Sequence, residues 1–144
     1  MKALLDSSVL IAALVEGHAR HGNAFPWLRS IRSDTVEGLI AAHSIAETYA
    51  VLSSLPISPR ITPAAAWALV EHSVLPFVQA IELSAEEVRG VVQRLSRMGL
   101  AGGVVYDALI AEAAGKAGAD CLITLNPSDF RRVLKAGEME VREP

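Results

Sequence analysis

Four acidic side chains stand where apolar runs end or helical runs begin, at Asp6, Glu47, Asp107 and Asp129. Asp6 closes the apolar run that starts at Ala3, and Asp107 lies inside the apolar stretch Val104–Ile110; neither has a Lys or Arg within three residues. A carboxylate in such surroundings needs a partner or a metal ion to stay charged. Ligation by oxygen alone suits Mg²⁺ or Mn²⁺ rather than zinc, and Mg²⁺ prefers phosphate-bearing substrates. The residues therefore predict metal-assisted phosphoester chemistry.

Each acid also has a purely structural interpretation at the start of a helix. Asp6 would cap a helix that begins near Ser8, and Asp107 would interact favourably with the dipole of its own helix. The segment Ser44–Glu47 has the pattern of a capping box, in which Glu47 would bond to the Ser44 amide. Ser84–Glu87 repeats that pattern, so the box also occurs here for structural reasons.

The remaining sequence predicts the elements that would position these acids. Short apolar runs indicate five strands, at Ala3–Asp6, Gly38–Ala42, Phe77–Leu83, Cys121–Leu125 and Met139–Arg142. Helical periodicity indicates helices between them, at Val9–Leu14, His21–Ile31, Ser44–Ser53, Pro63–Leu75, Ala85–Met98 and Val104–Ala117. Thr62 is expected to cap the fourth helix with Pro63 at its first position. Alternating strands and helices predict an α/β fold with a parallel sheet covered on both faces, and we expect the fourth and fifth helices to form a pair.

In such a sheet, ligands bind beyond the carboxyl ends of the strands. Asp6 ends the first strand, and Glu47 lies in the first turn of the helix after the second strand. Asp107 stands near the start of the helix that leads into the fourth strand, which Asn126 and Asp129 follow directly. Asn126–Asp129 also fits a helix start with Pro at its first position. Distant stretches of the chain should thus deliver acids to one edge of the sheet.

Composition limits the alternatives. With 144 residues, 51% hydrophobic and 20% charged, the chain can bury one sizeable core, and we expect a single domain over residues 1–144. A net charge of −3 argues against nucleic-acid binding through a broad basic face, although cations held by acids would weaken this objection. The lone Cys121 excludes an internal disulfide and a cysteine zinc site. Asp6 interrupts the first apolar run, and no run has the length of a membrane span, so we expect a cytoplasmic protein without membrane contact.

Four blocks of the sequence resemble those of PIN domains, in order and spacing: Leu4–Ile11, Ala46-Glu47, Tyr106–Ala111 and Leu122–Phe130. The resemblance spans the chain, and the compact size points to the VapC toxins of bacterial toxin–antitoxin pairs. It implies a three-layer α/β/α sandwich with a short central parallel sheet. It also implies an endoribonuclease that depends on Mg²⁺ or Mn²⁺, forms homodimers and is inhibited by a cognate antitoxin.

The same resemblance makes Asp6, Glu47 and Asp107 the central acids. For the fourth, family members often carry Asp where this chain has Asn126, and an Asn can ligate through its carbonyl without adding charge. We favour Asp129 as the charged member, with Asn126 close to it.

Two hydroxyls and several other side chains have more than one possible role. Ser8 and Thr124 should hydrogen-bond to the acids or to metal-bound waters, although Ser8 could equally be a helix N-cap. The four histidines, His18, His21, His43 and His72, show no metal-ligand spacing. Trp27 and Trp67 fit a core or an interface better than base stacking. A patch at the chain's end could contact an RNA backbone through Arg131, Arg132 and Lys135.

Rival functions are weaker. A haloacid-dehalogenase-like phosphatase would need a second acid where Ser8 stands, and a response-regulator receiver would need paired acids before its phosphoacceptor. The serious alternative is a catalytically inactive PIN-like module that binds RNA or protein, for which Asn126 is the only support in the sequence.

Overall fold

The computed structural model describes residues 1–144 and contains one five-stranded sheet. All neighbouring strands run parallel, in the order β3-β2-β1-β4-β5. Their bounds are Lys2–Leu5 for β1, Glu37–Ala41 for β2, Val78–Ile81 for β3, Cys121–Ile123 for β4 and Glu140–Arg142 for β5. The five predicted strands are all present. β1 and β2 each end one residue earlier than predicted, because a helix begins within two residues of each strand.

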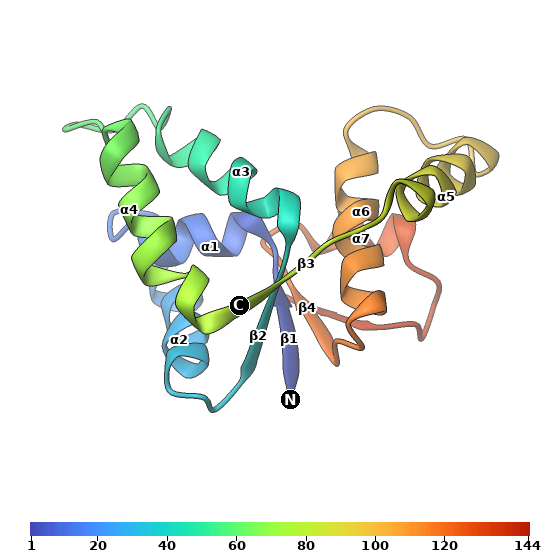
Figure 1. The fold of residues 1–144 in the computed structure, drawn as a ribbon, viewed down its shortest axis with the longest axis horizontal. Helices are drawn as coiled ribbons and strands as arrows, with labels where there is room; N and C mark the ends of the chain where they lie inside the picture. The colour runs from blue at the N-terminus through green and yellow to red at the C-terminus, as the bar shows by residue number, and fades with distance from the viewer.

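Seven helices and one 3₁₀ turn connect the strands, and they cover both faces of the sheet (Figure 1). On one face lie α1 (Ser7–Leu14), α2 (His21–Arg32), α3 (Ala42–Leu52) and α4 (Pro63–Ser73), which is followed by the 3₁₀ turn Leu75–Phe77. On the other face lie α5 (Ala85–Arg97), α6 (Val104–Lys116) and α7 (Pro127–Val133). This is the predicted three-layer α/β/α sandwich.

The sheet is apolar on both faces, as a sheet covered by helices requires. Successive side chains of a strand point to opposite faces, so Leu4 of β1 packs in one core cluster with Phe130 of α7, whereas Leu5 packs in another with Leu28 of α2. Burying each such side chain contributes about 1.5–3 kcal/mol. The two clusters hold β1 and β4 rigidly at the centre of the molecule, where their carboxyl ends carry the first predicted acid.

One glycine is required by close packing between the sheet and α2. A Cβ atom on Gly38 of β2 would lie 2.6 Å from Ile31 Cγ2 and 3.0 Å from Ile31 Cγ1. Ile31 is fully buried and β-branched, so it has few rotamers with which to move aside. Any larger residue at position 38 would push α2 away from β2.

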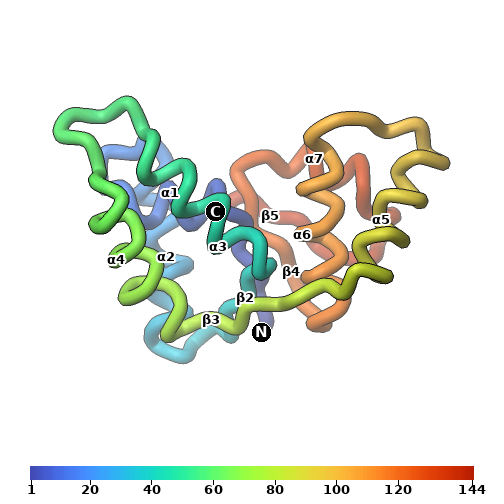
Figure 2. Tube along the Cα trace, turned by 45° about the horizontal axis from the view of Figure 1, so that its top comes forward, coloured from blue at the N-terminus to red at the C-terminus, as the bar shows by residue number.

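The expected pairing of the fourth and fifth helices is wrong. α4 packs against α3 on one face of the sheet, while α5 packs against α6 on the other. The two helices lie at opposite ends of the molecule (Figures 1 and 2). The cause is β3, an edge strand that lies between them in the sequence and at which the chain crosses from one face of the sheet to the other.

Two of the predicted helix starts are confirmed and one is wrong. The Thr62 hydroxyl accepts a hydrogen bond from the Ala65 amide at 3.1 Å, and the Ser84–Glu87 capping box is complete. By contrast, α3 begins at Ala42, directly after β2, so Ser44 lies inside the helix and cannot cap it. Its hydroxyl is buried without a hydrogen-bond partner. Glu47 therefore does not cap the start of α3. None of the helices is long and apolar enough to cross a membrane.

Candidate active site

Asp6 lies at the centre of the site, just beyond β1, with 5% of its surface exposed. Its amide donates to the Ile123 carbonyl at 3.0 Å, which joins the ends of β1 and β4. Its Oδ2 atom accepts hydrogen bonds from the hydroxyls of Ser8 at 2.6 Å and Thr124 at 2.8 Å, and its Oδ1 accepts one from Ser7 at 3.4 Å. Although Asp6 occupies the N-cap position of α1, its side chain makes no capping bond. Hydroxyls from two strand ends hold this carboxylate.

Ser7 connects Asp6 to Glu47. The Ser7 hydroxyl donates to Glu47 Oε1, the closer of its two carboxylate partners. A hydroxyl has one proton, so this bond leaves Asp6 Oδ1 only weakly engaged. Ser7 is a residue that the sequence interpretation did not single out. Ser7 and Ser8 form a polar pair directly after Asp6, which indicates a role near that acid. The sequence does not indicate that Glu47 on α3 is the partner of Ser7.

Asp107 and Asp129 approach from the other layer of helices. Asp107 lies in the first turn of α6 and Asp129 in the first turn of α7. The pKa of Asp107 is raised to about 6, first by burial of its carboxyl group and then by the negative charges of Asp6, Asp129 and Glu47. Three acids from distant parts of the chain thus act electrostatically on Asp107.

No cationic side chain neutralises this group. The ion pairs of the molecule all involve other acids. The capping interpretation also fails at α7, where Asn126 holds the N-cap position but its side chain makes no capping bond. The helix N-termini of α1, α6 and α7 point their partial positive charge toward the same edge of the sheet, which offsets part of the repulsion.

His43 also belongs to this neighbourhood, although its spacing in the sequence gave no indication. Burial lowers the pKa of His43, and the charges of Glu47 and Asp6 oppose that shift only in part. The imidazole is therefore neutral at pH 7 and brings no positive charge to the acids. His43 precedes Glu47 by four residues and so shares its face of α3, a relation that depends on the helix starting at Ala42 rather than at Ser44.

The donor chemistry of this group fits a hard divalent cation. All its anionic donors are carboxylate oxygens, and a cation would relieve the repulsion that adds to the effect of burial on the pKa of Asp107. The side chains as they stand do not bring three or more His, Cys, Asp or Glu donors into one metal-ligand arrangement. Mg²⁺ does not need such a cage, because it is commonly held by one or two carboxylates and retains several waters.

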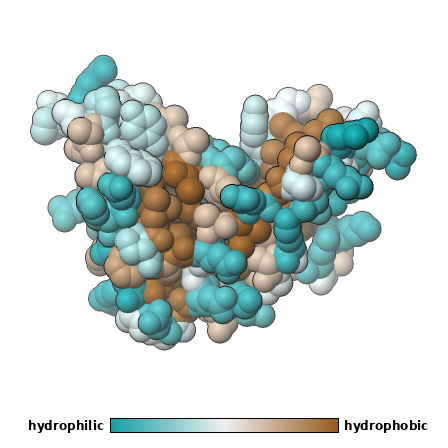
Figure 3. Space-filling model, in the orientation of Figure 1, coloured by the Kyte–Doolittle hydropathy of each residue, from teal (hydrophilic) through white to brown (hydrophobic).

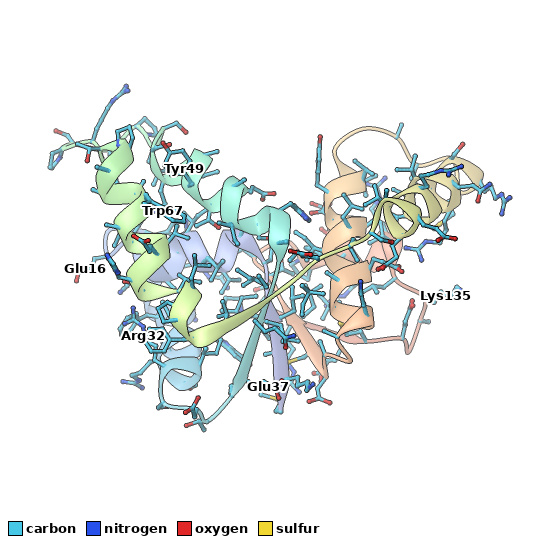
Figure 4. The ribbon with its side chains drawn as sticks, viewed as in Figure 1. Glu16, Arg32, Glu37, Tyr49, Trp67 and Lys135 are labelled. Atoms are coloured by element: carbon cyan, nitrogen blue, oxygen red, sulfur yellow. The ribbon has the colours of Figure 1, made fainter.

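A notch separates the two layers of helices that carry the acids (Figure 3). Figure 3 shows this notch at the top of the molecule, with hydrophilic side chains at its base. A separate apolar groove of about 670 Å³ runs between α3 and α4, lined by Ala42, Ile45, Ala46, Tyr49, Pro63 and Trp67. Tyr49 and Trp67 face this groove from neighbouring helices (Figure 4), and Trp67 is 42% exposed. Trp67 is therefore not a core residue, whereas Trp27 packs against the core cluster under α2.

Comparison with known proteins identifies the family. The sequence model of the PIN domain matches residues 3–135. The chain belongs to the PIN-domain family. Within that family it is 34% identical, over 113 residues, to ribonuclease VapC27 of Mycobacterium tuberculosis strain H37Rv, covering 78% of this chain and 76% of the relative. It is 33% identical, over 120 residues, to ribonuclease VapC40 of the same species, covering 81% of both chains.

The fold of this PIN domain also resembles that of a solved structure at lower sequence identity. The crystal structure of VapBC2 from Rickettsia felis, bound to a DNA fragment from its promoter, superposes with a TM-score of 0.65 at 19% identity. The match covers 99% of this chain and 98% of that one. The likeness extends to the sheet and to both helical layers.

Proposed function

We propose that this PIN-domain protein is a divalent-metal-dependent endoribonuclease that acts as the toxin of a toxin–antitoxin pair. One observation carries the proposal: four carboxylates converge on one edge of the sheet without a cationic partner, and their mutual repulsion helps to raise the pKa of Asp107 to about 6. The resemblance to ribonucleases at 33–34% identity supports RNA as the substrate.

In this proposal Asp6, Glu47, Asp107 and Asp129 hold Mg²⁺, or Mn²⁺ in its place, with the Asn126 carbonyl as an auxiliary oxygen. A metal ion held by these residues would supply Lewis acidity toward the phosphodiester and toward a water nucleophile.

The hydroxyl network prepares these acids for that task. Ser8 and Thr124 fix the direction of Asp6 Oδ2, and Ser7 fixes Glu47. Because Asp6 is nearly buried, it cannot swing out to solvent when the metal leaves. Orienting groups of this kind commonly affect metal affinity or activity by about 10–100-fold. Thr124→Val should therefore weaken cleavage by about that factor while retaining the shape of the side chain.

We further propose that an antitoxin protein silences the site. An Arg or Lys side chain from the partner would pair with the clustered carboxylates and compete with the metal. The apolar groove between α3 and α4 would receive an amphipathic helix of the partner, with Tyr49 and Trp67 as contacts. This groove replaces the helical pair that the sequence suggested, because α4 and α5 do not meet. RNA cleavage would take place in the cytoplasm, and we expect the free protein to be a homodimer, which light scattering would measure.

The decisive test compares the parent protein with Asp6→Asn. The parent should cleave RNA with Mg²⁺ or Mn²⁺ and lose activity in EDTA, whereas the variant should fold but not cleave. Expression of the parent should arrest growth, and co-expression of the antitoxin should relieve the arrest. If the parent binds RNA but cleaves none with either metal, the protein is an inactive binding module instead.

A further inference from the structure

An aromatic ring stands open to solvent beside the acids. Tyr106 directly precedes Asp107 in the first turn of α6, and 58% of its surface is exposed, more than for any other large apolar or aromatic side chain of the protein. Consecutive Cα atoms lie 3.8 Å apart, and consecutive side chains leave a helix about 100° apart. Since Asp107 is half-buried among the acids, the Tyr106 ring extends from the same helix end on the open side.

The other exposed aromatic rings either pair with a neighbouring side chain or line the groove between α3 and α4. Phe25 stacks on His21 with ring centroids 5.2 Å apart, and the Arg32 guanidinium lies 5.5 Å above the Phe77 ring. Tyr49 and Trp67 line the groove between α3 and α4. Tyr106 is thus the exposed ring that adjoins an acid in the sequence and takes no part in a stacked or cation–π pair.

The charge of the protein makes such a ring useful for an RNA substrate. The net charge is −3, and the four acids repel every phosphate that a bound metal does not contact. A group that carries no charge can contact the neighbouring nucleotides without this repulsion. Stacking of a base on an aromatic ring needs no positive charge and tolerates any base.

We propose that Tyr106 is a stacking platform for a nucleobase next to the phosphate that this site cleaves. The inference rests on the proposed ribonuclease function and assigns to α6 both an acid, Asp107, and the contact that positions the flanking nucleotide. It makes Tyr106 a determinant of substrate binding and leaves the chemical step to the acids.

The test measures KM and kcat for a short single-stranded RNA with one mapped cleavage site. Tyr106→Ala should raise KM by about 5- to 150-fold with a smaller change in kcat. Tyr106→Phe and Tyr106→Trp should retain the parent KM because they retain a ring. Phe25→Ala is the matched control, an exposed aromatic ring on α2 that stacks on His21, and should leave KM unchanged. Since Tyr106 is exposed, its variants should keep the unfolding midpoint of the parent.

A second substrate series identifies the stacked base. RNAs with a single abasic position on either side of the cleavage site should bind the parent more weakly at one position, and the same change should cost Tyr106→Ala nothing further. Equal abasic penalties in parent and variant, or an unchanged KM in Tyr106→Ala, would overturn the inference alone. A parent that neither binds nor cleaves any of these RNAs would overturn the proposed function together with it.

Discussion

Replacing Asp107 by Asn should make the metal-free protein more stable, and the gain should depend on pH. In the folded protein the Asp107 carboxyl has a pKa of about 6, against an ordinary value of 3.8. The folded state therefore binds this proton more tightly than the unfolded state does. The resulting stabilisation is fully present below about pH 4 and is lost as the pH rises through 6.

The size of the effect follows from the difference between the two pKa values. About two pKa units correspond to roughly 3 kcal/mol at most. Solvent reaches the half-buried carboxyl and screens part of the interaction, so we expect roughly 1–3 kcal/mol. The amide that replaces this carboxyl in the variant carries no charge at any pH. The difference in unfolding free energy, variant minus parent, should thus grow by this amount between pH 4 and pH 8.

Urea unfolding of both proteins in EDTA, at several pH values, measures this difference directly. Glu16→Gln is the control: Glu16 is exposed at the outer edge of the molecule, away from the notch (Figure 4), and its variant should track the parent at every pH. In millimolar Mg²⁺ the parent should regain stability through binding to its folded state, and Asp107→Asn should regain less. A variant-minus-parent difference that stays constant from pH 4 to pH 8 would show that neither burial nor the neighbouring acids raise the pKa of Asp107.

Three further predictions test other parts of the structure. Glu47→Gln should abolish cleavage with little change in stability, because the amide oxygen can still accept a hydrogen bond from Ser7. Its control, Glu87→Gln, weakens an exposed ion pair and a capping box. This control should lower the unfolding free energy by under about 1 kcal/mol and leave cleavage intact. Equal activity of these two variants would reduce Glu47 to a structural residue. Gly38→Ala should lower the unfolding free energy by about 1–3 kcal/mol through its clash with α2, and a parent-like urea midpoint would contradict this. Arg132→Ala should reduce the slope of log affinity for RNA against log salt concentration by about one, because Arg132 lies one helical turn beyond Asp129. Lys135→Ala should leave this slope unchanged, because the Lys135 side chain points away from the notch (Figure 4).

Much of the fold and the convergence of the acids could be predicted from local patterns. Asp6 and Asp129 each follow an apolar run short enough to be a strand, and in a parallel sheet the ends of such runs share one edge. The Ser84 capping box and the Thr62 N-cap could also be predicted from the sequence, because their hydrogen bonds join residues three positions apart.

Features that depend on contacts across the fold could not be predicted in this way. No side-chain capping bond marks the start of α3 at Ala42. The capping-box pattern at Ser44 therefore predicted the wrong helix start. The bond from Ser7 to Glu47 joins residues 40 positions apart. The separation of α4 from α5 follows from the placement of β3 at the sheet edge, and helical periodicity carries no information about which face of a sheet a helix covers.

The order in which the chain is synthesised gives the central position of β1 a biological consequence. A nascent chain that has emerged only as far as α5 contains Asp6 and Glu47 but lacks Asp107, Thr124 and Asp129. It also lacks β4, the strand that pairs with β1 and fixes the end that carries Asp6. The acids can therefore assemble only after nearly the whole chain has left the ribosome. A chain whose synthesis stops before α6 therefore cannot form the proposed metal site.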